Sequence, residues 1–222
     1  MLTKKIYNPD LLQMDAKILL YTRLAQSMFN YSWQHGKMGL LQFSKLTSTV
    51  WKAANLDDPY ADWILVKTYK ALDKGREKLQ VLEKQLELEL GQIRGIATMP
   101  ILNANPNAYP LQFSTVFGYM GAAFLADADY VLRQILTLKR LGIPIQNDVC
   151  SINHVVKCLQ DVFAIPRQWR HTGITRKDML EQNEKAHETI ALFGQIPDEI
   201  LNKKTDFHSL QKHMYAIAND EP

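Results

Sequence analysis

The chain has 222 residues, of which 46% are apolar and 22% are charged. These proportions are typical of a folded protein with one large or two small domains, and they exclude an intrinsically disordered chain. The formal net charge of +3 permits an anionic partner without requiring one.

No uninterrupted apolar run is long enough to span a membrane, and the first residues lack the apolar core of a signal peptide. The two cysteines, Cys150 and Cys158, are separated by about 12 Å if they lie on one helix. That separation is too large for a disulfide. The sequence therefore predicts a cytoplasmic protein with reduced, buried cysteines and no membrane contact.

Helical patterns dominate the first half of the chain. A first helix is predicted to begin at Asn8 and Pro9, which are suited to the cap and the first turn, and to end near Trp33. A short apolar stretch follows at residues 39–43. Ser44 then caps a second predicted helix.

A third and much longer helix is predicted from Pro59 to about Arg94. Apolar residues recur in it every seven positions, at Leu65, Leu72, Leu79, Leu86 and Ile93. This is the spacing of a coiled-coil seam, and the helix would be on the order of 55 Å long. We therefore expect a projecting stalk with a weak point at Gly75, although a helix of the same chain, such as residues 9–33, could also cover the seam.

Residues 96–126 contain no charged side chain, as expected of a surface buried between subunits. Within them, residues 108–117 read AYPLQFSTVF, and apolar and polar residues alternate from Leu111 to Ser114, the period of a half-buried strand. The strand has no evident partner in its own chain, and an unpaired strand leaves backbone groups without hydrogen bonds. We therefore expect it to pair with its copy in a second subunit.

Helical patterns continue after this strand. One helix is predicted at residues 118–141, and another begins at a cap at Asn147 and ends before Pro166. A basic stretch, PRQWRHTGITRKD, and short C-terminal helices complete the chain.

No motif for catalysis, for a cofactor or for a metal is evident. The chain lacks a glycine-rich phosphate loop, a dinucleotide-binding fingerprint and the serine-centred elbow of hydrolases. None of the six histidines forms a metal-binding pattern with a nearby cysteine or carboxylate. Asp127 and Asp129 diverge on a helix, so solvated or capping roles are expected for them. We therefore predict no enzyme, no metal, no cofactor and no small-molecule ligand.

A strand followed by two helices is half of a ribbon-helix-helix domain, in which two chains pair their strands and place the ribbon in the major groove. Gln112 and Ser114 would point outward and read base edges. The N-terminus of the second helix, from Asn147 to Ser151, would bind a phosphate. Further phosphate contacts are expected from the basic residues Arg167, Arg170, Arg176 and Lys177. The alternative is that these groups are simply solvated surface.

A second candidate unit exists because LQFS occurs at residues 41–44 as well as 111–114. In this unit the alternative ribbon would carry Gln42, Ser44 and Lys45. Its second helix starts with two aspartates, Asp57 and Asp58, which would repel phosphate. The unit with Gln112 and Ser114 is therefore favoured, but which strand forms the ribbon stays open.

Several strings resemble the AcaB family of transcriptional regulators of conjugative transfer, which includes proteins of integrating conjugative elements. They include GLLQFSKLTSTVWKAANLDDPYADW, PLQFSTVFGYMGAAFLADADYVL, GITRKD and GQIPDEIL, and the resemblance spans residues 13–201. The resemblance implies a homodimeric DNA-binding activator with a ribbon-helix-helix element, acting on transfer-gene promoters of mobile elements.

The sequence thus predicts a mainly α, ribbon-helix-helix-like homodimer with a coiled-coil stalk. Residues 1–98 would hold the N-terminal helices and the stalk, and residues 99–222 the strand, the dimer contact and the C-terminal helices. Its predicted function is sequence-specific regulation of conjugative transfer genes, most simply activation, through double-stranded DNA. The alternative is a non-enzymatic structural or assembly protein of a conjugation system that binds partners through its coiled-coil helix.

Overall fold

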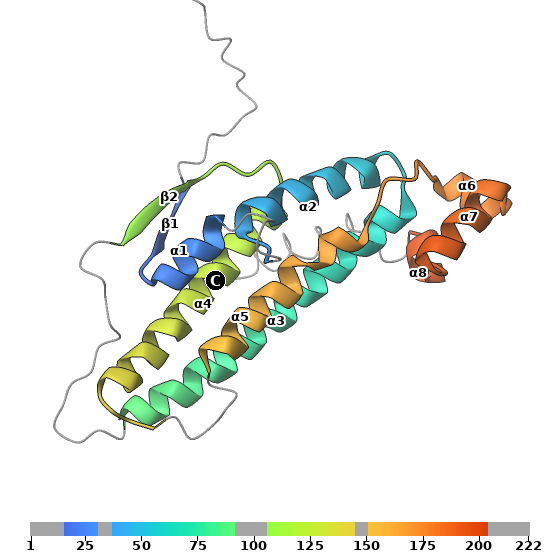
Figure 1. Cartoon of the computed structure of the whole chain (residues 1–222). Helices are drawn as coiled ribbons and strands as arrows, with labels where there is room; N and C mark the ends of the chain where they lie inside the picture. Colours follow the sequence, from blue (N-terminus) through green and yellow to red (C-terminus); the bar gives the residue numbers. More distant parts are fainter. Residues whose placement is uncertain (1–15, 31–36, 92–105, 145–150, 204–222) are drawn as a thin grey trace, which may run out of the picture.

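The computed structural model describes residues 16–30, 37–91, 106–144 and 151–203, which form a mainly helical protein with one small sheet (Figure 1). The elements are β1 (Ala16–Leu20), α1 (Arg23–Asn30), α2 (Leu40–Asn55), α3 (Pro59–Gly91), β2 (Asn107–Leu111), α4 (Val116–Arg140), α5 (Ile152–Phe163), the 3-10 helix η3 (Ile165–Gln168), α6 (Arg176–Glu181), α7 (Glu184–Phe193) and α8 (Asp198–Leu201). The mainly helical class predicted from the sequence is confirmed.

The helices α2, α3, α4 and α5 pack together around the main hydrophobic core. Phe43 of α2 stacks on Phe163 of α5 with 4.8 Å between ring centroids, and Phe124 of α4 meets Phe163 edge-on at 6.2 Å. All three rings are fully buried. Residues on both sides of the boundary predicted between residues 98 and 99 contribute to this core.

The long helix α3 is packed within the chain and does not project. Its heptad residues Leu65, Leu72, Leu79 and Leu86 are each at most 1% exposed. The helix contacts α2, α4 and α5 and runs beside α4 and α5 in Figure 1. The prediction of a projecting stalk is therefore wrong, because helices of the same chain cover the apolar seam. Ile93 and Arg94 lie outside the described residues.

Two glycines allow these helices to approach closely. A Cβ atom added to Gly75 of α3 would lie 2.8 Å from Phe124 Cζ and 3.3 Å from Val162 Cγ2. A Cβ atom added to Gly121 of α4 would lie 2.8 Å from Phe43 Cε1. Gly75 is therefore a packing position between α3, α4 and α5, and not the weak point of a stalk.

The two strands pair with each other in antiparallel register, from Ala16 opposite Leu111 to Leu20 opposite Asn107. Two predictions are corrected here. Residues 16–20 form a strand and not part of a helix, and β2 pairs with β1 of its own chain and not with its copy. The physical reason is that Ile18, Leu20 and Leu111 are buried on the bundle side, so the sheet completes the core.

A buried carboxylate holds the turn after β1 against the bundle. Asp129 of α4 accepts hydrogen bonds from the backbone N–H groups of Tyr21 (3.0 Å) and Thr22 (2.8 Å) and from the Thr22 hydroxyl (2.7 Å). It therefore satisfies donors near the start of α1, the capping role expected for it. Asp127, two residues earlier, forms a more exposed ion pair with Arg76 of α3 at 2.8 Å.

The first LQFS copy is helical. Residues 41–44 lie in the first turns of α2, and the buried Leu40, Phe43, Thr47 and Val50 follow helical spacing. The alternative ribbon with Gln42, Ser44 and Lys45 is therefore wrong. In the second copy, β2 ends at Leu111, so Gln112 and Ser114 follow the strand instead of alternating within it.

Helices α6, α7 and α8 form a C-terminal layer over the N-terminal end of α3, around a second apolar cluster (Figure 1). Its members include Tyr60 and Val66 of α3 together with Ile174, Met179 and Ile196. Two of the predicted phosphate-binding arginines, Arg167 and Arg170, come just before this layer in the chain, so the attachment of the layer constrains where they lie.

Candidate nucleic-acid interface

The exposed face of α2 lies between two open hollows. The first, of about 400 Å³, lies between α2 and the segment that joins β2 to α4. Its lining residues are Leu41, Ser44, Lys45, Ser48, Thr49 and Lys52 of α2, with Gln112, Phe113 and Ser114. The Ser48 and Ser114 hydroxyls share a hydrogen bond of 2.9 Å, which ties the segment to the helix.

The second hollow, of about 540 Å³, lies on the other side of Lys45. Its lining residues are Met38, Gln42, Lys45 and Leu46, with Arg167, Trp169 and Arg170 from η3 and the segment after it. Lys45 lines both hollows, so they adjoin at this side chain, on the exposed face of α2. We call the two hollows together the basic groove.

The charged side chains that line the basic groove are all positive. Lys45, Lys52, Arg167 and Arg170 are exposed cations, and no carboxylate occurs among the residues that line it. The sequence explains this, because residues 37–56 and 162–177 contain no Asp or Glu. A groove of this charge attracts an anion, and hydroxyl and amide groups in the same groove can donate and accept hydrogen bonds.

The structure brings together most of the predicted DNA-binding residues. Gln112 and Ser114 of the favoured unit line the groove beside Ser44 and Lys45 of the alternative unit, with Gln42, Arg167 and Arg170 farther along it. The two sequence units are therefore parts of one surface, although neither is an intersubunit ribbon. The roles of these residues toward DNA stay predictions.

Two other predicted residues, Ser151 and Lys177, lie elsewhere. Ser151 caps the far end of α5, where its hydroxyl accepts from the His154 N–H at 3.2 Å, about 18 Å along the helix from η3. Lys177 is exposed on α6 and pairs with Glu181 at 3.7 Å. Neither residue lines the groove. Asn147 lies outside the described residues.

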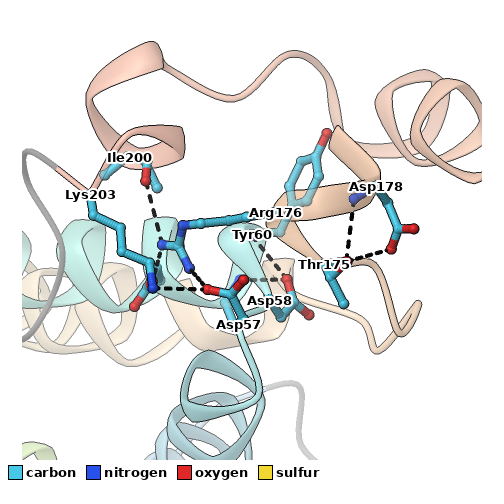
Figure 2. Close-up of polar contacts among 10 residues, drawn as sticks. Asp57, Asp58, Tyr60, Thr175, Arg176, Asp178, Ile200 and Lys203 are labelled. Carbon is cyan, nitrogen blue, oxygen red and sulfur yellow. Dashed lines mark hydrogen bonds and ion pairs between the residues drawn. The ribbon is translucent and has the colours of Figure 1, made fainter. Parts of the chain in front are cut away.

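Arg176, a fourth predicted phosphate contact, is buried in an ion-pair cluster (Figure 2). Its guanidinium donates to Asp57 at 2.7 Å, to Asp62 and to the Ile200 carbonyl at 3.4 Å. Lys203 pairs with Asp57 at 3.1 Å. Burial lowers the pKa of Arg176, but the carboxylates of Asp62 and Asp57 outweigh it and the net shift is upward. The expectation of a phosphate contact is thus wrong for Arg176, because its side chain is buried and both terminal nitrogens of its guanidinium donate to protein oxygens.

This cluster, which we call the Arg176 clamp, joins three of the strings that carry the family resemblance. DDPYADW supplies Asp57 and Asp62, GITRKD supplies Arg176, and GQIPDEIL supplies the Ile200 carbonyl. Tyr60 adds a hydrogen bond from its hydroxyl to the Gly194 carbonyl at 2.7 Å. These strings therefore describe how the C-terminal layer is attached to α3.

Asp58 connects this attachment to the basic groove. Its Oδ1 caps α3 by accepting from the N–H groups of Tyr60 (2.9 Å) and Ala61 (3.1 Å), and its Oδ2 accepts from Trp169 Nε1 (3.1 Å). Burial raises the pKa of Asp58, and these hydrogen bonds oppose the shift without cancelling it. The bond to Trp169 fixes the indole that lies between Arg167 and Arg170 in the sequence, and thereby orients that wall of the groove.

Sequence reasoning missed several groove residues. Ser48 and Thr49 of α2 lie three and four residues after Lys45, so they share its face of the helix, and helical spacing alone could have identified them. Trp169 carried no such signal, because its role depends on a contact with Asp58 that lies 111 residues away in the chain.

Two other features, a membrane-spanning helix and a metal-binding cluster, are absent from the described residues. None of its helices combines the length and apolarity needed to cross a membrane. Among the same residues, no three side chains of His, Cys, Asp or Glu gather as metal ligands would.

Comparison with known proteins agrees with the resemblance seen in the sequence. The family model described as transcriptional regulator AcaB matches residues 8–211. The fold is similar to the crystal structure of selenomethionine-containing AcaB from uropathogenic E. coli, with a TM-score of 0.50, 15% sequence identity, and coverage of 84% of this chain and 94% of that chain. Comparison with curated proteins gave no match. Because the family model covers most of its length, the chain belongs to the AcaB family of transcriptional regulators.

Proposed function

We propose that this protein regulates transcription by binding duplex DNA in the basic groove. The observation that carries the proposal is the convergence at Lys45 of two hollows, which bring together cations and hydrogen-bonding side chains from α2, from the segment after β2 and from the segment after η3. Family membership supplies the regulatory role.

The groove offers the two kinds of contact that DNA recognition requires. Lys45, Lys52, Arg167 and Arg170 would contact phosphates, which supply affinity without sequence information. The exposed Gln112 would reach base edges, where a glutamine amide can contact adenine through two hydrogen bonds. An α-helix fits the major groove, so the exposed face of α2 is suited to lie along or within it.

We propose further that two copies act together and that their targets are conjugative transfer genes, which they activate. The resemblance found in the sequence supports both statements. A two-fold dimer would present two basic grooves to two half-sites, so that modest contacts in each groove add up in one complex. Strand pairing between chains is not part of this proposal, because β2 already pairs with β1.

The alternative role, in conjugation assembly through the coiled-coil helix, finds less support. It requires an apolar seam on α3 that is available to a partner. The seam residues, including Leu72, Leu79 and Leu86, are buried against the protein's own helices. What α3 exposes is mostly charged and polar.

The proposal is tested by titrating labelled promoter and random duplexes at several salt concentrations. Lys45→Ala should weaken binding to both duplexes and make the salt dependence shallower by about 0.9 for each phosphate that the variant no longer neutralises. Lys139→Ala is the matched control, because Lys139 is an exposed lysine at the far end of α4, about 35 Å along that helix from the groove. Equal decreases in affinity for both variants, or no decrease for Lys45→Ala, would place DNA elsewhere.

A further inference from the structure

A small aromatic pocket lies between α3 and the C-terminal layer. Its volume is about 60 Å³, and its walls are Tyr60, Trp63, Ile64 and Lys67 of α3, with Gln168, Trp169 and Phe193. Tyr60 packs against Phe193 with ring centroids 5.5 Å apart and against Trp63 at 6.3 Å. We call this the Trp63 pocket.

Two polar groups of the Trp63 pocket are hydrogen-bonded within the protein, whereas Lys67 forms a cation–π contact. The Tyr60 hydroxyl is bonded to the Gly194 carbonyl, and Trp169 Nε1 is bonded to Asp58. Lys67, by contrast, has its ammonium 3.4 Å from the centre of the Trp63 ring and forms no ion pair with any carboxylate of the described residues. Burial alone lowers the pKa of Lys67. The pocket is therefore lined by a partly desolvated ammonium group that has no anionic partner within the described part of the chain.

The size and charge of the pocket define what it can hold. A water-sized group needs roughly 10–15 Å³ of such space, so about 60 Å³ accommodates about four to six non-hydrogen atoms. A cationic ligand is disfavoured, because Lys67 already occupies the face of Trp63. The pocket is complementary to a small carboxylate. Its short apolar part would pack on the aromatic rings, and its carboxylate would face Lys67 and the exposed amide of Gln168.

The pocket shares one wall with the basic groove. Trp169 lines the Trp63 pocket and also lines the groove beside Arg167 and Arg170. A molecule that packs against the Trp169 indole would displace the ring and thereby alter its hydrogen bond to Asp58. The segment 167–170 would then shift relative to α2, and the phosphate contacts of its two arginines with it.

We propose that the Trp63 pocket binds a small monocarboxylate of four to six non-hydrogen atoms and that its occupancy changes DNA affinity through Trp169. The second half of this statement rests on the proposed function, whereas the first half does not. Propionate is the probe, and its neutral analogue propionamide has nearly the same shape without the charge.

Binding is measured by following the tryptophan indole N–H signals in NMR spectra at constant ionic strength, with assignments from Trp→Phe variants. Propionate should shift the Trp63 and Trp169 signals saturably, and Trp51, which packs on Phe117 away from this pocket, should not respond. Lys67→Met keeps the apolar stem over the Trp63 ring and should raise the Kd about tenfold or more. Lys74→Met, at an exposed lysine one heptad further along α3, should leave the Kd unchanged.

Three results would overturn the site. These are the absence of shifts at Trp63 and Trp169, equal affinity for propionamide, and stronger binding of tetramethylammonium. The comparison of the three probes on the unmodified protein decides the matter even if Lys67→Met fails to fold.

The coupling is measured separately, as duplex affinity with and without saturating propionate, against chloride at equal ionic strength. The affinity should change at least threefold in the unmodified protein and by less in Lys67→Met at the same propionate concentration, because the variant has the higher Kd for propionate. A saturable NMR shift without any change in duplex affinity would overturn the coupling. A protein that binds no duplex in either condition would contradict the proposed function, while the NMR result would still decide the carboxylate site.

Discussion

Replacing Arg176 with methionine should be among the most destabilising single changes in the C-terminal layer. The side chains of Arg176 and Asp62 are only 6% and 7% exposed, so Arg176→Met leaves a buried carboxylate without its cation. Breaking a buried ion pair from one side costs about 3–5 kcal/mol of unfolding free energy. Asp57 adds less, because its side chain is 44% exposed and keeps Lys203 as a partner.

The assay is urea unfolding followed by circular dichroism, with the urea dependence of the free energy compared between variants. Arg76→Met is the matched control, because Arg76 and Asp127 form an ion pair of 2.8 Å whose side chains are 46% and 34% exposed. Such a pair contributes about 0–1 kcal/mol. Adding Asp62→Leu to Arg176→Met should recover part of the stability, because no buried charge is then left alone. The reasoning is refuted if Arg176→Met costs no more than Arg76→Met.

Three further predictions concern packing, protonation and base reading. Gly75→Ala should lower the free energy of unfolding despite a helix-propensity gain of about 1 kcal/mol, because the new Cβ would lie 2.8 Å from Phe124 Cζ. Gly91→Ala is the control, because its Cβ meets nothing within 4 Å and should not lower the stability. Urea unfolding of both variants checks this. Burial raises the pKa of Asp57, but hydrogen bonds with Arg176 and Lys203 outweigh burial, so the pKa in the folded protein lies below the ordinary value of 3.8. The stability that these pairs contribute is therefore lost as the pH falls below 3.8. Lys203→Met should raise this pKa, which a carboxyl NMR titration measures. Gln112→Ala should reduce the preference for promoter over scrambled duplex by roughly 1–3 kcal/mol and leave the salt slope unchanged, and the idea fails if the preference persists.

The helices could be predicted largely from local pattern. The heptad spacing located α3, and the helix expected at residues 118–141 is α4, at Val116–Arg140. What covers α3 could not be predicted, because a seven-residue repeat states only that one face is apolar and not which helix packs on it.

The strands show where local pattern failed. β1 is only five residues long, and its apolar residues also fit the helical spacing of the segments on either side. Its partner lies more than 85 residues away in the chain, so no local signal linked the two strands. The two LQFS copies make the same point. Phe43 stacks on Phe163 within a helix, whereas Phe113 contacts Tyr119 from a loop at 5.4 Å, so tertiary packing decides the conformation of identical tetrapeptides.

The residues of the candidate surface were predicted in part, but their common location was not. Gln112, Lys45 and Arg170 were each identified from residue type and neighbourhood, but their common location follows from the packing of α2 between two distant segments. Arg176 was misassigned for the opposite reason. An arginine in a basic stretch has the same sequence signature whether it meets phosphate or a buried carboxylate.

The location of DNA is tested most directly by photo-crosslinking. p-Benzoylphenylalanine is introduced in place of Thr49, which is exposed in the basic groove, and in a second variant in place of Val81, which is 56% exposed on α3 outside the groove. On irradiation with promoter duplex, the variant at position 49 should crosslink to DNA and the variant at position 81 should not. Crosslinking at position 81 without crosslinking at position 49 would contradict a DNA-binding role for the basic groove.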